Sequence, residues 1–209
     1  VKIIGSNLAD ILASGTIEAF SYADIKTTKK FLGVTTSVKV KEQLDSLDGI
    51  FESQFASVFA NAGRALELAS STFGANFDPT KFTVSTANLS LKGLEGDALT
   101  KAIEGFFSST LDKWASVLVD GSDVLTKFQK VGDGAFETMI RLAGETNTFV
   151  NYANQLGLKF KETGLNAVIV TQSLADMAGG FDQLNNGMAS YYENFFSETE
   201  KSQKGLATI

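Results

Sequence analysis

The feature that most constrains this chain is a regular row of apolar residues in its last fifth. Seven of them repeat in alternating steps of three and four: Leu174, Met177, Phe181, Leu184, Met188, Tyr191 and Phe195. This spacing is the a/d pattern of a coiled-coil seam sustained over three heptads. It predicts a long helix whose seam is the candidate interface, covered either by the rest of the chain or by a second copy.

Three glycines interrupt this predicted helix. Gly179, Gly180 and Gly187 each weaken a helix by about 1 kcal/mol relative to Ala. The seam is therefore not expected to be stable without a partner.

The chain contains no His and no Cys. Disulfides, Fe–S clusters, thiolate nucleophiles and Cys-based zinc sites require Cys, and His is the commonest metal ligand and general base. Serine and cysteine triads, zinc hydrolases and haem proteins are therefore excluded. We expect no metal site and no cofactor.

The charge balance argues against nucleic acid as a partner. The 209 residues include 18 Lys and Arg against 24 Asp and Glu, a formal net charge of −6. Gripping phosphates requires clustered Lys and Arg, so no specific nucleic-acid binding is expected. The longest apolar runs, such as residues 167–170, are far shorter than the roughly 20 residues that cross a bilayer. The opening residues lack the features of a signal peptide, and we interpret the chain as a fragment of something longer.

Periodicity predicts an α+β fold that is predominantly helical. Alternation at Val34, Val38 and Val40 indicates a strand, which would pair with residues 16–26 in a hairpin, and a third strand is expected over residues 82–91. A helical period over residues 44–73 ends at Gly74. We expect a small antiparallel sheet, the hairpin plus the third strand, packed with several helices, followed by a long C-terminal helix.

The chain divides into three predicted regions. Residues 1–95 form the hairpin, helix and third strand, residues 96–165 are helical, and residues 166–209 form the long heptad-like helix. In the middle region, helices are expected from Asp97 to about residue 120, over residues 122–143 and over residues 147–156. The triplet Gly132-Asp133-Gly134 is interpreted as a break between two helices, because no further ligands follow at the spacing of a cation or phosphate loop.

No catalytic constellation emerges from the reactive groups that remain. Glu193, Glu198 and Glu200 lie close together, but a cluster on a polar helical stretch is typical of a solvated face. A carboxylate-based enzyme acting on cell-wall glycan stays open as an alternative, because that chemistry needs only two Asp or Glu. A second alternative is a membrane-active helical toxin that exposes its adjacent Phe and Tyr pairs.

Three stretches together resemble the C-terminal part of tail tape measure proteins of long-tailed bacteriophages and prophages. They are Leu89-Ser-Leu-Lys-Gly-Leu-Glu-Gly-Asp97, Phe128-Gln-Lys-Val-Gly-Asp-Gly-Ala-Phe-Glu-Thr138, and Gly179-Gly-Phe-Asp-Gln-Leu184 leading to Tyr191-Tyr-Glu-Asn-Phe-Phe-Ser-Glu-Thr-Glu200. The similarity spans most of the chain in the same order. None of the three is a chemical signature, so the resemblance depends on their joint occurrence.

The resemblance implies a noncatalytic structural role. Such proteins lie in the tail lumen, set tail length, are seated at the tail tip on the hub, and leave the tube to help genome ejection through the host envelope. This chain would be the tail-tip anchor portion, self-associated as a trimer in the virion and in contact with tail-tip hub and tail tube proteins. It would reach the host cell envelope after ejection, with transient contact there.

Overall fold

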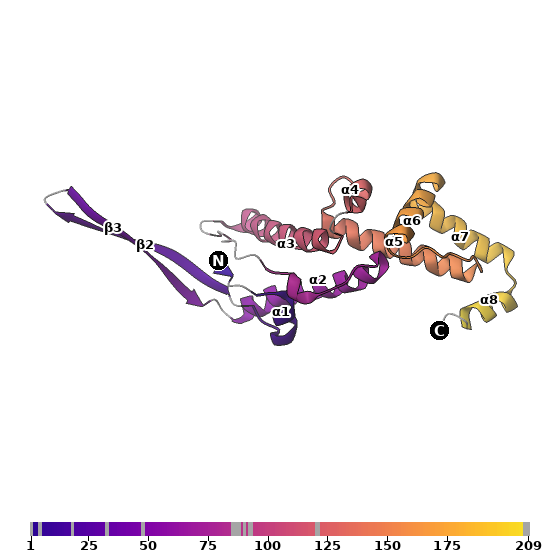
Figure 1. Ribbon diagram of the computed structural model, residues 1–209, viewed down its shortest axis with the longest axis horizontal. Coiled ribbons are helices and arrows are strands. Elements are labelled where there is room, and N and C mark those ends of the chain that lie inside the picture. Colours follow the sequence, from indigo (N-terminus) through magenta and orange to yellow (C-terminus); the bar gives the residue numbers. More distant parts are fainter. Residues whose placement is uncertain are drawn as a thin grey trace. The chain divides into compact units, whose positions relative to one another are not determined.

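The computed structural model describes residues 2–3, 6–17, 19–31, 34–46, 49–84, 89, 91, 94–119 and 122–206, with the side chains of 2–3, 19–31, 34–46, 49–51 and 204–206 left aside. The elements follow one another as β1 (Lys2–Ile3), α1 (Leu8–Ser14), β2 (Ala19–Phe31), β3 (Val34–Ser46), α2 (Gly49–Phe73), η1 (Pro79–Lys81), α3 (Gly96–Leu118), α4 (Val124–Phe128), α5 (Ala135–Gln155), α6 (Gly164–Ala178), α7 (Phe181–Phe195) and α8 (Glu198–Leu206). Figure 1 shows them in sequence colours.

The chain groups into two compact units. The first comprises residues 1–64 and 78–110, and the second comprises residues 65–77 and 111–209. The bounds of these two units differ from those of the three predicted regions, 1–95, 96–165 and 166–209. The three-region division remains a prediction.

The predicted fold class is wrong, because within the described residues no third strand over residues 82–91 joins the hairpin. The strands that form are ordered β1-β2-β3, and β2 pairs with β3 from Phe20 opposite Ser46 to Phe31 opposite Val34. They make a long two-stranded ribbon (Figure 1) whose strands contact mainly each other and β1.

The alternation over residues 82–84 has a different cause from the one predicted. Phe82 and Val84 are both buried, yet this segment forms only one isolated bridge, between Thr83 and Asn7. The Leu8 N–H donates to the Phe82 carbonyl at 2.8 Å, and the Val84 N–H donates to the Ser6 carbonyl at 3.0 Å. A short extended segment held against the start of α1 produces the same two-residue period as a strand. Positions 85–88 and 90 of the predicted strand lie outside the described residues.

The first unit is built on aromatic and aliphatic packing around α1 and the beginning of α2. Leu8, Ile11, Phe59 and Phe82 are fully or almost fully buried. The Asn7 side chain begins α1 by accepting the Asp10 N–H at 2.9 Å, as N-cap residues do.

Two helices of this unit meet through four phenylalanines. Phe55 and Phe59 of α2 contact Phe106 and Phe107 of α3, with the Phe55 and Phe107 ring centroids 4.8 Å apart. Both members of the adjacent pair Phe106 and Phe107 thus pack on the same neighbours.

The second unit is a helical assembly in which α5 contacts α4, α6 and α7. Its core includes Trp114, Met139, Leu142 and Val168. α5 is one continuous helix, so the predicted break before residue 147 is wrong. The predicted break at Gly132-Asp133-Gly134 is confirmed, because it separates α4 from α5.

Two backbones in this unit approach each other where α2 ends and α6 begins. Gly74 has φ +66° and Gly164 has φ +59°, so both adopt the left-handed conformation that favours glycine. A Cβ added to Gly164 would lie 3.2 Å from the Phe73 carbonyl oxygen, and one added to Gly74 would lie 3.2 Å from the Gly164 Cα. The predicted end of the helix at Gly74 is confirmed, and its glycine serves this contact as well as the turn.

The predicted long C-terminal helix is also wrong. The chain turns between α6 and α7 at Gly179 (φ +89°) and Gly180 (φ +126°), and again between α7 and α8 at Phe196. Two consecutive residues with positive φ cannot continue a right-handed helix. Periodicity predicted the apolar face and could not register this turn, because the three-and-four spacing continues through it without a slip.

Candidate functional site

The candidate site is the apolar row, which the structure divides between α6 and α7. Leu174 is half-buried on α6, whereas Met177 at the end of α6 is 85% exposed. Phe181, Leu184 and Met188 are half-buried on α7. The row ends in exposed aromatic residues, Tyr191 and the 71% exposed Phe195.

α7 contains no buried residue, although it contacts both α5 and α6. The exposed rings of Tyr191 and Phe195 stack on each other with centroids 4.6 Å apart and planes at 16°. Stacking shields part of two apolar faces that the remainder of the unit leaves in water. α7 therefore presents a ready apolar surface at its C-terminal end.

An open cavity of about 410 Å³ lies between α7 and the end of α5, and we call it the apolar groove. It is lined by Leu156, Leu158, Ala178, Gln183, Leu184, Gly187, Met188 and Tyr191. A Cβ added to Gly187 would have no neighbour within 4 Å. The groove is thus unfilled space beside a helix that the chain packs only loosely.

The groove includes three of the predicted interface residues and omits the other four. Leu184, Met188 and Tyr191 line it. Sequence reasoning missed Leu156 and Leu158, which follow the end of α5. Leu156 was expected as the last residue of a helix, and Leu158 lies in no periodic segment. The signal that could have found Gly187 was its position beside the seam, where we counted it only as a weak point of the helix.

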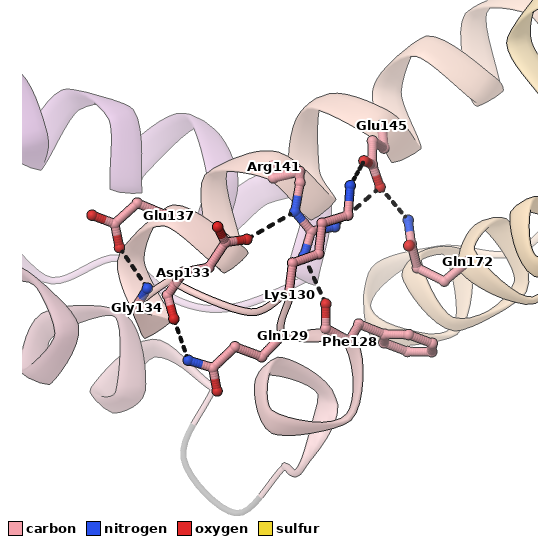
Figure 2. Close-up of polar contacts among 9 residues, drawn as sticks. All are labelled: Phe128, Gln129, Lys130, Asp133, Gly134, Glu137, Arg141, Glu145 and Gln172. Carbon is pink, nitrogen blue, oxygen red and sulfur yellow. Dashed lines mark hydrogen bonds and ion pairs between the residues drawn. The ribbon is translucent and has the colours of Figure 1, made fainter. Parts of the chain in front are cut away.

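A second cluster in this unit is polar and centres on Arg141 of α5 (Figure 2). Its guanidinium donates to the Phe128 carbonyl at 2.6 Å, to Asp133 Oδ2 at 3.3 Å and to Glu145 Oε2 at 3.4 Å. Glu145 also accepts from Gln172 of α6 at 2.7 Å and lies 3.7 Å from the Lys130 ammonium.

The Arg141 cluster explains the conformation of the glycine-flanked loop. Gln129 donates to the Asp133 carbonyl, and Glu137 accepts the Gly134 N–H at 3.0 Å at the start of α5. Asp112 of α3 accepts the next available N–H, that of Phe136, at 2.9 Å. These contacts engage the carboxylates and two N–H groups at the start of α5. The cluster fixes the loop between α4 and α5 and joins α5 to α6.

The acidic residues near the C-terminal end are also accounted for by local contacts. The Lys201 ammonium lies 2.8 Å from Glu193 and 3.0 Å from Glu198. These hydrogen bonds raise the pKa of Lys201 above its usual value. Glu200 accepts from the Ser197 N–H at 2.8 Å, as in a capping box at the start of α8. The cluster attaches α8 to α7.

Four buried side-chain oxygens have no hydrogen-bond partner within the described part of the chain. They are the hydroxyls of Thr138, Thr146 and Thr171 and the Oδ1 of Asn185. A buried polar atom without a partner costs roughly 1–3 kcal/mol. The Asn185 oxygen belongs to α7, so the packing of α7 against its neighbours has a specific unfavourable contribution.

No chemistry-bearing arrangement emerges elsewhere in the described ranges. Within them, no group of three or more acidic, His or Cys side chains is placed to hold a metal ion. No described helix combines the length and the apolar character that a bilayer crossing requires.

Comparison of the chain with protein-family models, with curated proteins and with solved structures found no match.

Proposed function

We propose that this chain is a noncatalytic structural component of a bacteriophage tail, the tail-tip anchor portion of a tape measure protein. In this role it takes part in tail assembly and length determination and in genome ejection into the host. It lies in the tail lumen and at the tail tip of the virion. Its partners are further copies of itself, forming a trimer in the virion, and the proteins of the tail-tip hub and tail tube.

The observation that carries the structural part of this proposal is the surface of α7. A helix with a regular apolar row, no buried residue and a stacked exposed Tyr191–Phe195 pair is built to be covered by another molecule. The noncatalytic part of the proposal is supported by the carboxylates Glu193, Glu198 and Glu200, which are engaged in ion pairs and a helix cap. No observation favours the glycan hydrolase over this reading.

Sedimentation equilibrium over a wide concentration range tests the association. We expect the Tyr191→Ala/Phe195→Ala variant to associate at least about tenfold more weakly than the unaltered chain, since truncation of a buried aromatic anchor commonly costs more than about 1.4 kcal/mol. Its monomer should unfold at nearly the same denaturant concentration, because both side chains are exposed. Asn186→Ala, on the opposite, polar side of α7, is the matched control. Unchanged association in the double variant would contradict the proposal.

The phage assignment has its own test, which uses the reading frame that encodes the chain. Several hundred upstream residues of continuous helical pattern support a tape measure protein. An upstream secretion signal joined directly to this chain would contradict it.

A further inference from the structure

The apolar row keeps its register across the turn that separates α6 from α7. The step from Met177 to Phe181 is four residues, as a heptad requires, although Gly179 and Gly180 bend the chain between them. If the two helices were never joined into one, the number of residues in the turn would not have to match the heptad spacing. Here, straightening the two glycines would join α6 and α7 into one helix over residues 164–195 with all seven seam residues on one face.

The bent arrangement leaves part of that seam uncovered. Met177 and Phe195 stay in water, at 85% and 71% exposure. The apolar groove of about 410 Å³ stays open beside α7, and the Asn185 oxygen is buried without a partner among the described residues. Release of α7 would open the groove to water and free the Asn185 oxygen, and covering of the released seam would bury Met177 and Phe195.

The remainder of the unit does not depend on α7 in the way it depends on α6. Ala167, Val168, Thr171 and Ala175 of α6 are buried, whereas α7 has no buried residue. α6 also holds Glu145 of α5 through Gln172. α6 can therefore stay on α5 while α7 moves.

The charges identify what would cover the straight seam. In heptad terms the positions flanking the seam are all uncharged: Ala178, Gly180, Asn185, Gly187, Tyr192 and Asn194. The three carboxylates of the segment, Asp176, Asp182 and Glu193, fall on the outer positions, and residues 164–195 contain no Lys or Arg. Copies of this helix can thus meet along the seam without like charges in contact, whereas nothing on its edges would recognise a charged partner.

We propose that α6 and α7 are the bent form of a two-state element, and that the straight form, one helix over residues 164–195, is covered by the same segment of further copies of this chain. This inference rests on the proposed function, in which α7 mediates association. It adds that association straightens the turn at Gly179 and Gly180.

Spin labels report the bend directly. The chain has no Cys, so Asn166→Cys/Ser190→Cys gives two specific labelling sites, both exposed, one on α6 and one on α7. In a straight helix these positions are about 36 Å apart at about 1.5 Å per residue. We expect electron–electron distance measurement to give a clearly shorter distance for the dilute chain. With the labelled chain diluted into an associating excess of unlabelled chain, a population near the long distance should appear.

Gly179→Ala/Gly180→Ala tests the cause. Each replacement of glycine by alanine favours the helical, straight form by about fivefold. The bent form would also hold each alanine at positive φ, which L residues disfavour. The double change therefore shifts the equilibrium between the bent and straight forms toward the straight form by at least about 25-fold. We expect the long distance and tighter association to appear together. Gly144→Ala, an exposed helical position on α5 with open space around it, is the matched control and should change neither.

The outcomes separate this inference from the proposed function. A chain that associates through Tyr191 and Phe195 but keeps the short distance at every concentration overturns the two-state element and leaves the proposed function standing. Straightening without association overturns the assignment of further copies as the cover. A chain that neither associates nor straightens overturns both.

Discussion

Replacement of Arg141 tests whether the polar cluster of the second unit contributes to its stability. Arg141→Met keeps most of the aliphatic length of the side chain and removes the guanidinium. In the structure that group donates to Asp133, to Glu145 and to the Phe128 carbonyl. The change therefore removes the hydrogen bonds with little loss of packing.

The expected loss is about 2 kcal/mol. The short bond to the Phe128 carbonyl and the two longer charge-assisted bonds contribute on the order of 1 kcal/mol each. About 1 kcal/mol returns because the side chain is no longer held in one rotamer. Screening is limited, since the side chains of Arg141 and Glu145 are only 19% and 12% exposed. For a chain of this length the loss corresponds to a decrease in Tm of roughly 4–8 °C.

Urea unfolding followed by circular dichroism measures the effect on the free energy of unfolding. Arg64→Met is the control, because Arg64 is exposed and its side chain donates to Asn61 Oδ1 at 3.3 Å. It should change stability by less than about 0.5 kcal/mol. Arg141→Lys should lose most of what Arg141→Met loses, because one ammonium cannot serve three separated acceptors. Equal stability of Arg141→Met and Arg64→Met would refute the reasoning.

Four further outcomes follow from single contacts. Gly164→Ala should destabilise the chain by roughly 1–3 kcal/mol in urea unfolding, because the left-handed backbone and a contact with backbone atoms both oppose a Cβ; a neutral result would mean that this approach is not made in solution. Thr171→Val should stabilise the chain by about 1 kcal/mol in the same assay, since it removes a buried hydroxyl without a described partner, and a loss would indicate a hydrogen bond to water. Asp112→Ala should cost about 1 kcal/mol by removing the cap of α5, with a smaller loss for Asp112→Asn, which keeps an acceptor oxygen; equal losses would argue against the cap. The pKa of Lys201, measured by NMR, should exceed that of a free lysine and decrease in Glu193→Gln. The contribution of the Lys201 ion pair to stability is complete below the unfolded-state pKa and is lost as pH rises through the folded-state pKa. An unshifted pKa of Lys201 would contradict the ion pair.

Sequence periodicity predicted the end of α2 and not its beginning, since residues 44–46 of the predicted helix belong to β3 and α2 begins at Gly49. The end of α2 at Gly74 and the break between α4 and α5 follow from residues whose local conformation is strongly restricted. The packing of the adjacent pair Phe106 and Phe107 does not follow from periodicity, since the two side chains point about 100° apart on a helix. Both still contact Phe55 and Phe59, because large rings reach across that angle.

The missing third strand and the divided C-terminal helix have one physical explanation. A period of two reports which side chains are buried, and Phe82 and Val84 are buried, but the period does not say which backbone supplies the hydrogen bonds. In the same way the heptad spacing reports one apolar face and is silent on a turn that preserves its phase. Nonlocal contacts decide both cases, and the same limit kept Leu156 and Leu158 out of the predicted site.

Gly63 and Gly164, two of the described glycines with close neighbours, differ in how an error at each could be repaired. A methyl group at Gly63 would meet the side chain of Leu8, so a smaller residue at position 8 could make room for it. A methyl group at Gly164 would meet the carbonyl of Phe73 and the Cα of Gly74, which every amino acid shares. A screen for compensating second substitutions should therefore recover suppressors of Gly63→Ala at position 8, whereas for Gly164→Ala reversion to glycine is the direct route back.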